Sequence, residues 1–245
     1  MKRISAIFCG LLFCFAAGFL AYKTLYLAIA PKEEPDARTV QMAREAQYIR
    51  EREAEYVRLL EQGTKELYED QDEKAARRTL EQALDIALDD TQRYQAWRWL
   101  AEAAGETDAA LRKRAGQQMA SIGKTARERS EGLFVAATAQ EKLGSVREAV
   151  REYQAAAAGY EKAGAFAEAC RCLQYAADAA LLSGMRDIKL CRRLLDREGK
   201  LLERVENGPK KETLAYDLEL SKADLERRER YLDNEKRKFT KNEGK

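Results

Sequence analysis

The stretch LGSVREAVREYQAAAAGYEKAGAFAEACRCLQYAADAALLSGMRDIKL, residues 143–190, decides the fold of this chain. In it Gly144, Gly164 and Gly184 recur at intervals of twenty residues, and each opens a new run of small, apolar and charged side chains. Glycine readily adopts the left-handed backbone conformation that ends a helix. We therefore predict helices of about seventeen residues joined by tight turns, and such helices must pack antiparallel to their neighbours.

The two repeats that begin at Gly144 and Gly164 also share a pattern of residue sizes. A small residue, Ala149 or Ala169, is followed four residues later by a larger side chain and seven residues later by another alanine. Small residues let adjacent helices approach closely, and the larger residue fills the remaining space. Since no single hairpin can bury its apolar face alone, the pattern predicts a stack of helical hairpins.

This pattern of residues resembles that of a known family of helical repeats. The stretch from Gly132 through Gly144 to Ala156 is similar to a tetratricopeptide repeat, whose second helix has the same small-x3-large-x2-small pattern. Another match runs from about Leu60 to Ala83, and the twenty-residue spacing is also similar to the SNAP-like branch of these solenoids. The resemblance covers roughly residues 55–205, within a predicted solenoid domain of residues 36–207. The family's full aromatic-x2-Leu-Gly start is missing, and the loose phase between residues 90 and 130 predicts an irregular pair of helices.

The resemblance implies a binding platform in which a groove holds an extended peptide or a partner helix. A carboxylate clamp of the chaperone-binding kind is not supported, because every asparagine of the chain lies outside the repeats, at Asn207, Asn234 and Asn242. Binding would come from a few buried aromatic or aliphatic contacts with charged rims. The candidate partner-binding residues are Tyr153, Tyr160, Phe166 and Tyr175. The alternative is that these side chains belong to the core.

The amino-terminal residues 1–31 predict a transmembrane signal-anchor. Nineteen residues from Ile4 to Tyr22 carry no charge, and as a helix they span about 28 Å, close to the hydrocarbon core of a bilayer. The apolar character continues to Ala30. The alternatives are a core helix and a signal peptide cleaved near Ala30, although Pro31 directly after that position disfavours cleavage.

Charges near this segment predict its orientation. Lys2 and Arg3 precede the segment, whereas the acidic residues Glu33, Glu34 and Asp36 follow it closely. By the positive-inside rule, the amino terminus stays in the cytoplasm and the body of the chain lies on the extracytoplasmic side.

Two further long helices are predicted at the ends of the solenoid. The segment from Asp36 to about Leu60 has one apolar stripe, which indicates either a first solenoid helix or a stalk that dimerises. After the stop at residues 207–209, residues 210–245 form a polar, coiled-coil-like helix. Its apolar residues repeat every seven positions and form a narrow stripe. This stripe indicates either a helix that caps the last repeat or a tail that binds a partner. The candidate contact residues are Leu218, Leu225 and Leu232.

Composition excludes several classes of function. The 44 Lys and Arg residues nearly balance 42 Asp and Glu residues, whereas a nucleic-acid-binding protein usually has a clear basic excess. The chain has no histidine, which removes Ser-His-Asp and Cys-His catalysis and histidine-ligated metals. No phosphate-binding loop occurs, and no cofactor is expected. Cys170, Cys172 and Cys191 are interpreted as small buried apolar residues.

These observations predict an all-α, membrane-anchored scaffold or adaptor that binds proteins or peptides and is not an enzyme. One alternative is a structural subunit of a larger cell-envelope complex. The chain could assemble as a homo-oligomer or within that larger complex. Another alternative is a helical enzyme that acts on cell wall, which would need a glutamate in an apolar cleft.

Overall fold

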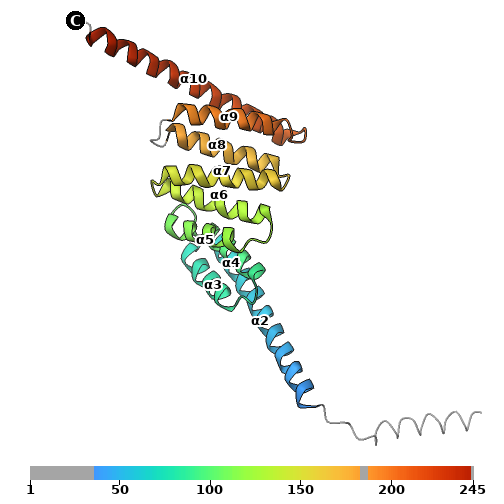
Figure 1. Cartoon of the computed structure of the whole chain (residues 1–245). Helices are drawn as coiled ribbons and strands as arrows, with labels where there is room; N and C mark the ends of the chain where they lie inside the picture. The colour runs from blue at the N-terminus through green and yellow to red at the C-terminus, as the bar shows by residue number, and fades with distance from the viewer. Residues whose placement is uncertain (1–35, 183–186, 244–245) are drawn as a thin grey trace, which may run out of the picture. The chain divides into compact units, whose positions relative to one another are not determined.

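The computed structural model describes residues 36–182 and 187–243, and every regular element in those ranges is an α-helix (Figure 1). This confirms the predicted all-α class. The helices are α2 (Ala37–Tyr68), α3 (Glu73–Ile86), α4 (Asp90–Ala104), α5 (Ala109–Ile122), α6 (Ala126–Lys142), α7 (Val146–Lys162), α8 (Phe166–Leu182), α9 (Ile188–Leu202) and α10 (Pro209–Glu243).

No helix in the described ranges is long and apolar enough to cross a membrane. The predicted anchor, Ile4–Ala30, lies outside the described residues.

The chain divides into two units, residues 1–49 and residues 50–245. In the first unit the described residues begin α2 and are largely exposed. In the second unit α2 continues, and its Tyr56, Leu59 and Gly63 are buried. The hydroxyl of Tyr56 donates a hydrogen bond to the backbone oxygen of Gln92 in α4 (2.6 Å). Residues 50–68 of α2 therefore pack against the helices that follow them in this unit.

The predicted glycine turns are confirmed at two of the three positions. Gly144 and Gly164 follow α6 and α7 with φ of 79° and 73°, and α6, α7 and α8 are each 17 residues long. Gly184, the third turn glycine, lies outside the described residues.

Between residues 90 and 130 the chain forms a pair of helices, α4 and α5, which have 15 and 14 residues and are shorter than the 17-residue helices α6, α7 and α8. The starts of α4 and α5 are fixed by aspartates at the N-cap: the Asp89 carboxylate accepts from the amide of Gln92, and that of Asp108 accepts from the amide of Leu111. The next helix, α6, begins with a capping box between Thr125 and Glu128. Such caps satisfy amides that have no partner inside the helix.

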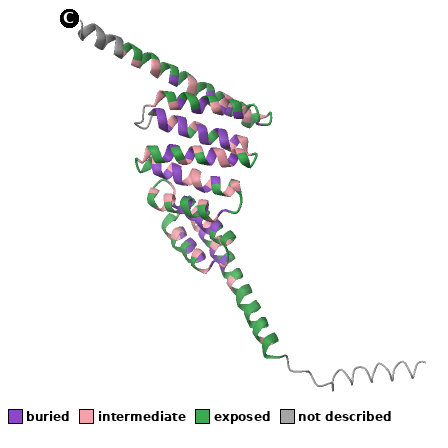
Figure 2. Cartoon of the chain, in the orientation of Figure 1, coloured by how far each residue is buried: buried purple, intermediate pink, exposed green. Residues whose placement is uncertain are grey.

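The helices from α3 to α10 form a solenoid-like stack. Each one packs against the next helix along the chain, and α10 also packs against α8 (Figure 1). The largest apolar core lies between α6 and α10 and consists mostly of alanines, leucines and the three free cysteines, all buried as predicted (Figure 2). The predominance of alanine explains how the helices come close enough to exclude water.

Candidate binding groove

Three aromatic side chains from successive helices form one cluster. Phe134 of α6 lies 5.7 Å from Tyr153 of α7 and 5.4 Å from Tyr175 of α8, and the two tyrosine rings stack at 5.6 Å between centroids. Each such aromatic pair stabilises a fold by about 0.5–1.5 kcal/mol, in addition to the contribution of the apolar area that it buries. Tyr153 is fully buried, whereas Tyr175 is 45% exposed. The cluster therefore fixes an exposed tyrosine on a rigid base.

Beside this cluster lies a cavity of about 680 Å³, here called the aromatic groove. Its walls come from α6, α7, α8 and the first two turns of α10. The apolar and aromatic part of its lining consists of Phe134, Tyr160, Cys172, Tyr175, Pro209 and Leu214. The polar part consists of Glu168, Arg171, Gln174, Lys210, Thr213 and Asp217. An apolar centre with a few convergent polar groups is typical of a binding site.

Two ion pairs meet at Glu168, which lines the groove together with Lys210. The ammonium of Lys210 lies 3.1 Å from the carboxylate of Glu168, and the guanidinium of Arg127 lies 3.7 Å from it. Burial raises the pKa of Glu168, but the hydrogen bond from Lys210 and the two positive charges outweigh burial and hold that pKa below its usual value. Glu168 is therefore ionised at neutral pH and ties α10 to α8.

The four aromatic residues predicted from the sequence separate in the structure. Tyr160 and Tyr175 line the aromatic groove, and Tyr153 supports Tyr175 from below. Burial raises the pKa of Tyr153, with the charge of Glu141 adding to the effect, so this hydroxyl stays protonated and donates to the Glu141 carboxylate (3.2 Å). Phe166 does not line the groove: its ring centroid lies 4.0 Å from the guanidinium carbon of Arg204, and it lines an adjoining cavity of about 450 Å³ that shares Glu168, Pro209 and Lys210 with the groove.

The predicted leucines of the C-terminal helix also differ from one another. Leu218 and Leu225 are buried in the core that α10 shares with α8 and α9, while Leu232 is half-buried. The first half of α10 therefore covers the last hairpin, and Leu218 and Leu225 are unavailable to a partner as long as α10 stays in place.

Sequence reasoning missed two groups of residues. Phe134 and Leu214 line the groove, although neither stood out as a candidate. Glu198 of α9 is fully buried, and neither of its carboxyl oxygens has a hydrogen-bond partner among the described residues. Its position could have been found, since residue 198 falls on the apolar face of α9 at helical spacing from Leu194, Leu195 and Leu201.

The environment of Glu198 is unusual for a carboxylate. Burial, with the charges of Asp178 and Asp217 adding to it and Lys222 partly opposing it, raises the pKa of Glu198 to about 8. A raised pKa is what a catalytic acid needs, but a fully buried side chain cannot meet a substrate in this conformation.

Known protein families, curated proteins and solved structures give no match to this chain.

Proposed function

We propose that this protein is a membrane-anchored scaffold that binds a segment of a partner protein in the aromatic groove. The observation that carries the proposal is the combination of an exposed tyrosine, a rigid aromatic base and a charged rim around one cavity. Aromatic residues in well-packed pockets supply most of the energy in protein interfaces, while charged rims contribute mainly to specificity.

The lining restricts the chemistry of the partner. The apolar part of the lining, which includes Phe134, Tyr175 and Leu214, suits an aliphatic or aromatic side chain. The rim offers both charges, from Arg171 and from Asp217. A helix or extended peptide with one large apolar anchor flanked by an acidic and a basic residue fits this surface. The tetratricopeptide-like pattern of the sequence supports the same mode of binding.

Site-specific crosslinking tests the groove. With a photoreactive benzoylphenylalanine in place of Tyr175 in native membranes, we expect one discrete adduct, because Tyr175 would touch the anchor side chain. The matched control has the same group in place of Tyr216, which is 65% exposed on α10 and outside the groove. Adding Phe134→Ser should reduce the adduct at position 175 by at least about tenfold, as expected for a central contact. Identical adducts from positions 175 and 216, or an adduct that Phe134→Ser leaves unchanged, would argue against the groove.

The anchoring part of the proposal rests on the apolar run Ile4–Ala30. We expect the protein to remain in the membrane fraction after alkaline carbonate extraction, and its intact mass to include the amino-terminal segment. Protease added to the extracytoplasmic side should degrade the body of the chain. A mature protein that begins at Pro31 and is extracted by carbonate would instead show cleavage and secretion.

Stoichiometry separates the adaptor from the alternative of a structural subunit of a larger envelope complex. An adaptor yields substoichiometric adducts that depend on Phe134. A subunit yields a fixed ratio to its neighbours, with adducts at several surfaces, including position 216.

A further inference from the structure

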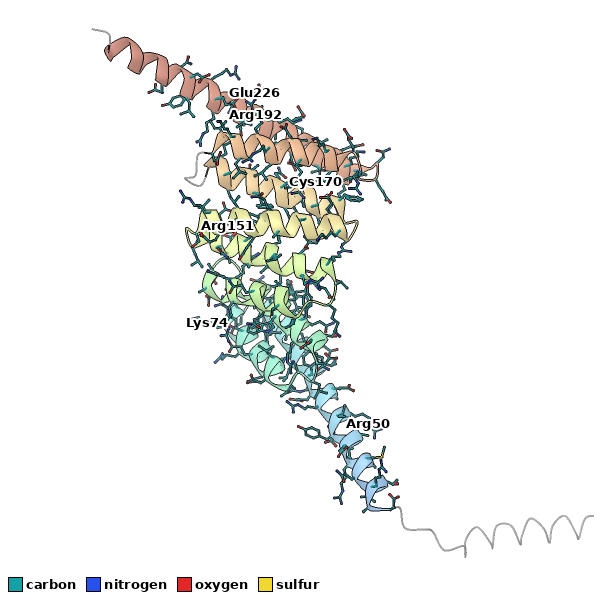
Figure 3. The ribbon with its side chains drawn as sticks, viewed as in Figure 1. Arg50, Lys74, Arg151, Cys170, Arg192 and Glu226 are labelled. Carbon is teal, nitrogen blue, oxygen red and sulfur yellow. The ribbon has the colours of Figure 1, made fainter. Side chains whose placement is uncertain are left out.

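The interface between α8, α9 and α10 contains acidic side chains from all three helices. Glu198 of α9 is fully buried without a hydrogen-bond partner for either carboxyl oxygen among the described residues. Asp178 of α8 and Asp217 of α10 are close enough to act electrostatically on it. Figure 3 labels one residue in each of these helices, Cys170 in α8, Arg192 in α9 and Glu226 in α10.

The other ionisable groups that face Glu198 do not neutralise it. From α8, the thiol of Cys170 donates to the backbone oxygen of Glu198 (3.8 Å) and not to its carboxyl group. From α10, the ammonium of Lys222 lowers the pKa of Glu198 only partly, and it is bonded to Glu219 at 3.0 Å. An ionised Glu198 would therefore be a buried charge beside two like charges, which is strongly unfavourable.

The same interface holds α10 in place. Leu214, Leu218 and Leu225 bury their side chains against α8 and α9. The guanidinium of Arg228 donates to the backbone oxygen of Leu181 (2.6 Å), and Arg192 pairs with Glu229. Residues 209–217 of α10 also supply one wall of the aromatic groove. The position of α10 therefore decides whether the groove is complete.

We propose that ionisation of Glu198 and Asp178 loosens α10 from α8 and α9, so that the aromatic groove is complete at acidic pH and loses its α10 wall as the pH rises. The functional consequence rests on the groove being the binding surface proposed above, whereas the movement of α10 does not.

The direction of the effect follows from where the proton is held more tightly. With α10 docked, burial and the charges of Asp178 and Asp217, partly opposed by Lys222, raise the pKa of Glu198 from its ordinary value of 4.5 to about 8. Burial, together with the charges of Glu141, Asp224 and Asp217, likewise raises the pKa of Asp178 from 3.8 to about 6. The docked state thus binds more protons. Docking of α10 is tightest at a pH below the ordinary pKa values of the two carboxyl groups, and it weakens as the pH rises. Above about pH 8 the bound protons no longer contribute to docking.

Amide hydrogen exchange in the full chain, reconstituted in lipid nanodiscs, tests this inference. Protection factors of amides in residues 211–225, corrected for the intrinsic pH dependence of exchange, should fall by at least about tenfold between pH 6 and pH 9, because one extra bound proton changes the docking equilibrium by up to about tenfold per pH unit. Glu198→Gln, which has the shape of the neutral acid, should remove most of this fall. Glu226→Gln is the matched control, because Glu226 is exposed on α10, and it should behave as the wild type.

A pH-independent protection of α10 in the wild type, or an equal fall in Glu198→Gln, would overturn the inference. If Glu198→Gln fails to fold, Glu198→Met supplies a second neutral side chain of similar size. The measurement reads α10 without any partner, so its failure would leave the groove intact as a proposed binding surface. Failure of crosslinking at position 175 would in turn leave the pH dependence of α10 standing.

Discussion

Gly132→Ala is expected to destabilise the protein by about 3 kcal/mol, an unusually large effect for the addition of one methyl group. At Gly132 of α6 a Cβ atom would lie 2.6 Å from the backbone oxygen of Gly116 and 2.8 Å from the Cα atom of Ala120, both in α5. Backbone atoms cannot yield as the end of a flexible side chain can. The two helices would have to move apart, and the alanines that pack between them would lose contact.

The matched control is the same substitution at Gly199 of α9. There the nearest atom to an added Cβ is the Leu218 Cδ2, at an ordinary contact distance of 3.7 Å. Alanine has the higher helix propensity, by about 1 kcal/mol. Gly199→Ala should therefore leave the protein equally stable or slightly more stable. Thermal unfolding followed by circular dichroism in detergent checks both variants, and equal midpoints for the two would show that α5 and α6 do not touch through their backbones.

The contact between α5 and α6 illustrates which parts of the fold the sequence predicts well. Where a glycine ends a helix, as at Gly144 and Gly164, the twenty-residue spacing predicted both helix length and turn position, because a local backbone preference decides both. Between residues 90 and 130, aspartates at the N-cap begin the helices, Gly105 and Gly123 are the C-cap residues, and Gly116 lies inside α5. Gly116 and Gly132 are each followed by an alanine four residues later. This pattern of small residues permits another helix to pack closely, but it does not reveal which helix that is.

The candidate site was predictable only in part, for a similar reason. Tyr160 and Tyr175 were predicted as candidates because they are aromatic and lie in the repeats, and the structure places both in one groove. Phe166 has the same local character, yet it packs against Arg204 and lines the adjoining cavity instead. Which aromatic residues share a cavity depends on the rotation of each helix and on the return of α10 across α8, and neither is a local property of the sequence.

Glu198→Met is expected to stabilise the protein, by about 2 kcal/mol at pH 7 and by more at pH 9. A buried carboxyl group without hydrogen-bond partners costs free energy even when neutral, and apolar replacements of similar volume at such positions are commonly stabilising. Methionine is unbranched and adapts to the space that the glutamate leaves among Cys170, Leu194 and Leu195. A gain of this size raises the midpoint of thermal unfolding by about 4–8 °C for a chain of this length.

The comparison with Glu226→Met makes the result specific, because Glu226 is exposed on α10 and its replacement should change stability by less than about 0.5 kcal/mol. The gain from Glu198→Met should grow between pH 7 and pH 9, since ionisation destabilises the wild type and burial and the acidic neighbours raise the pKa of Glu198 to about 8. A loss of stability in Glu198→Met would mean that the carboxyl group has a partner in solution. A gain would mean that a costly acid is kept at the place where α10 joins the stack, which is what a pH-dependent closure of the groove requires.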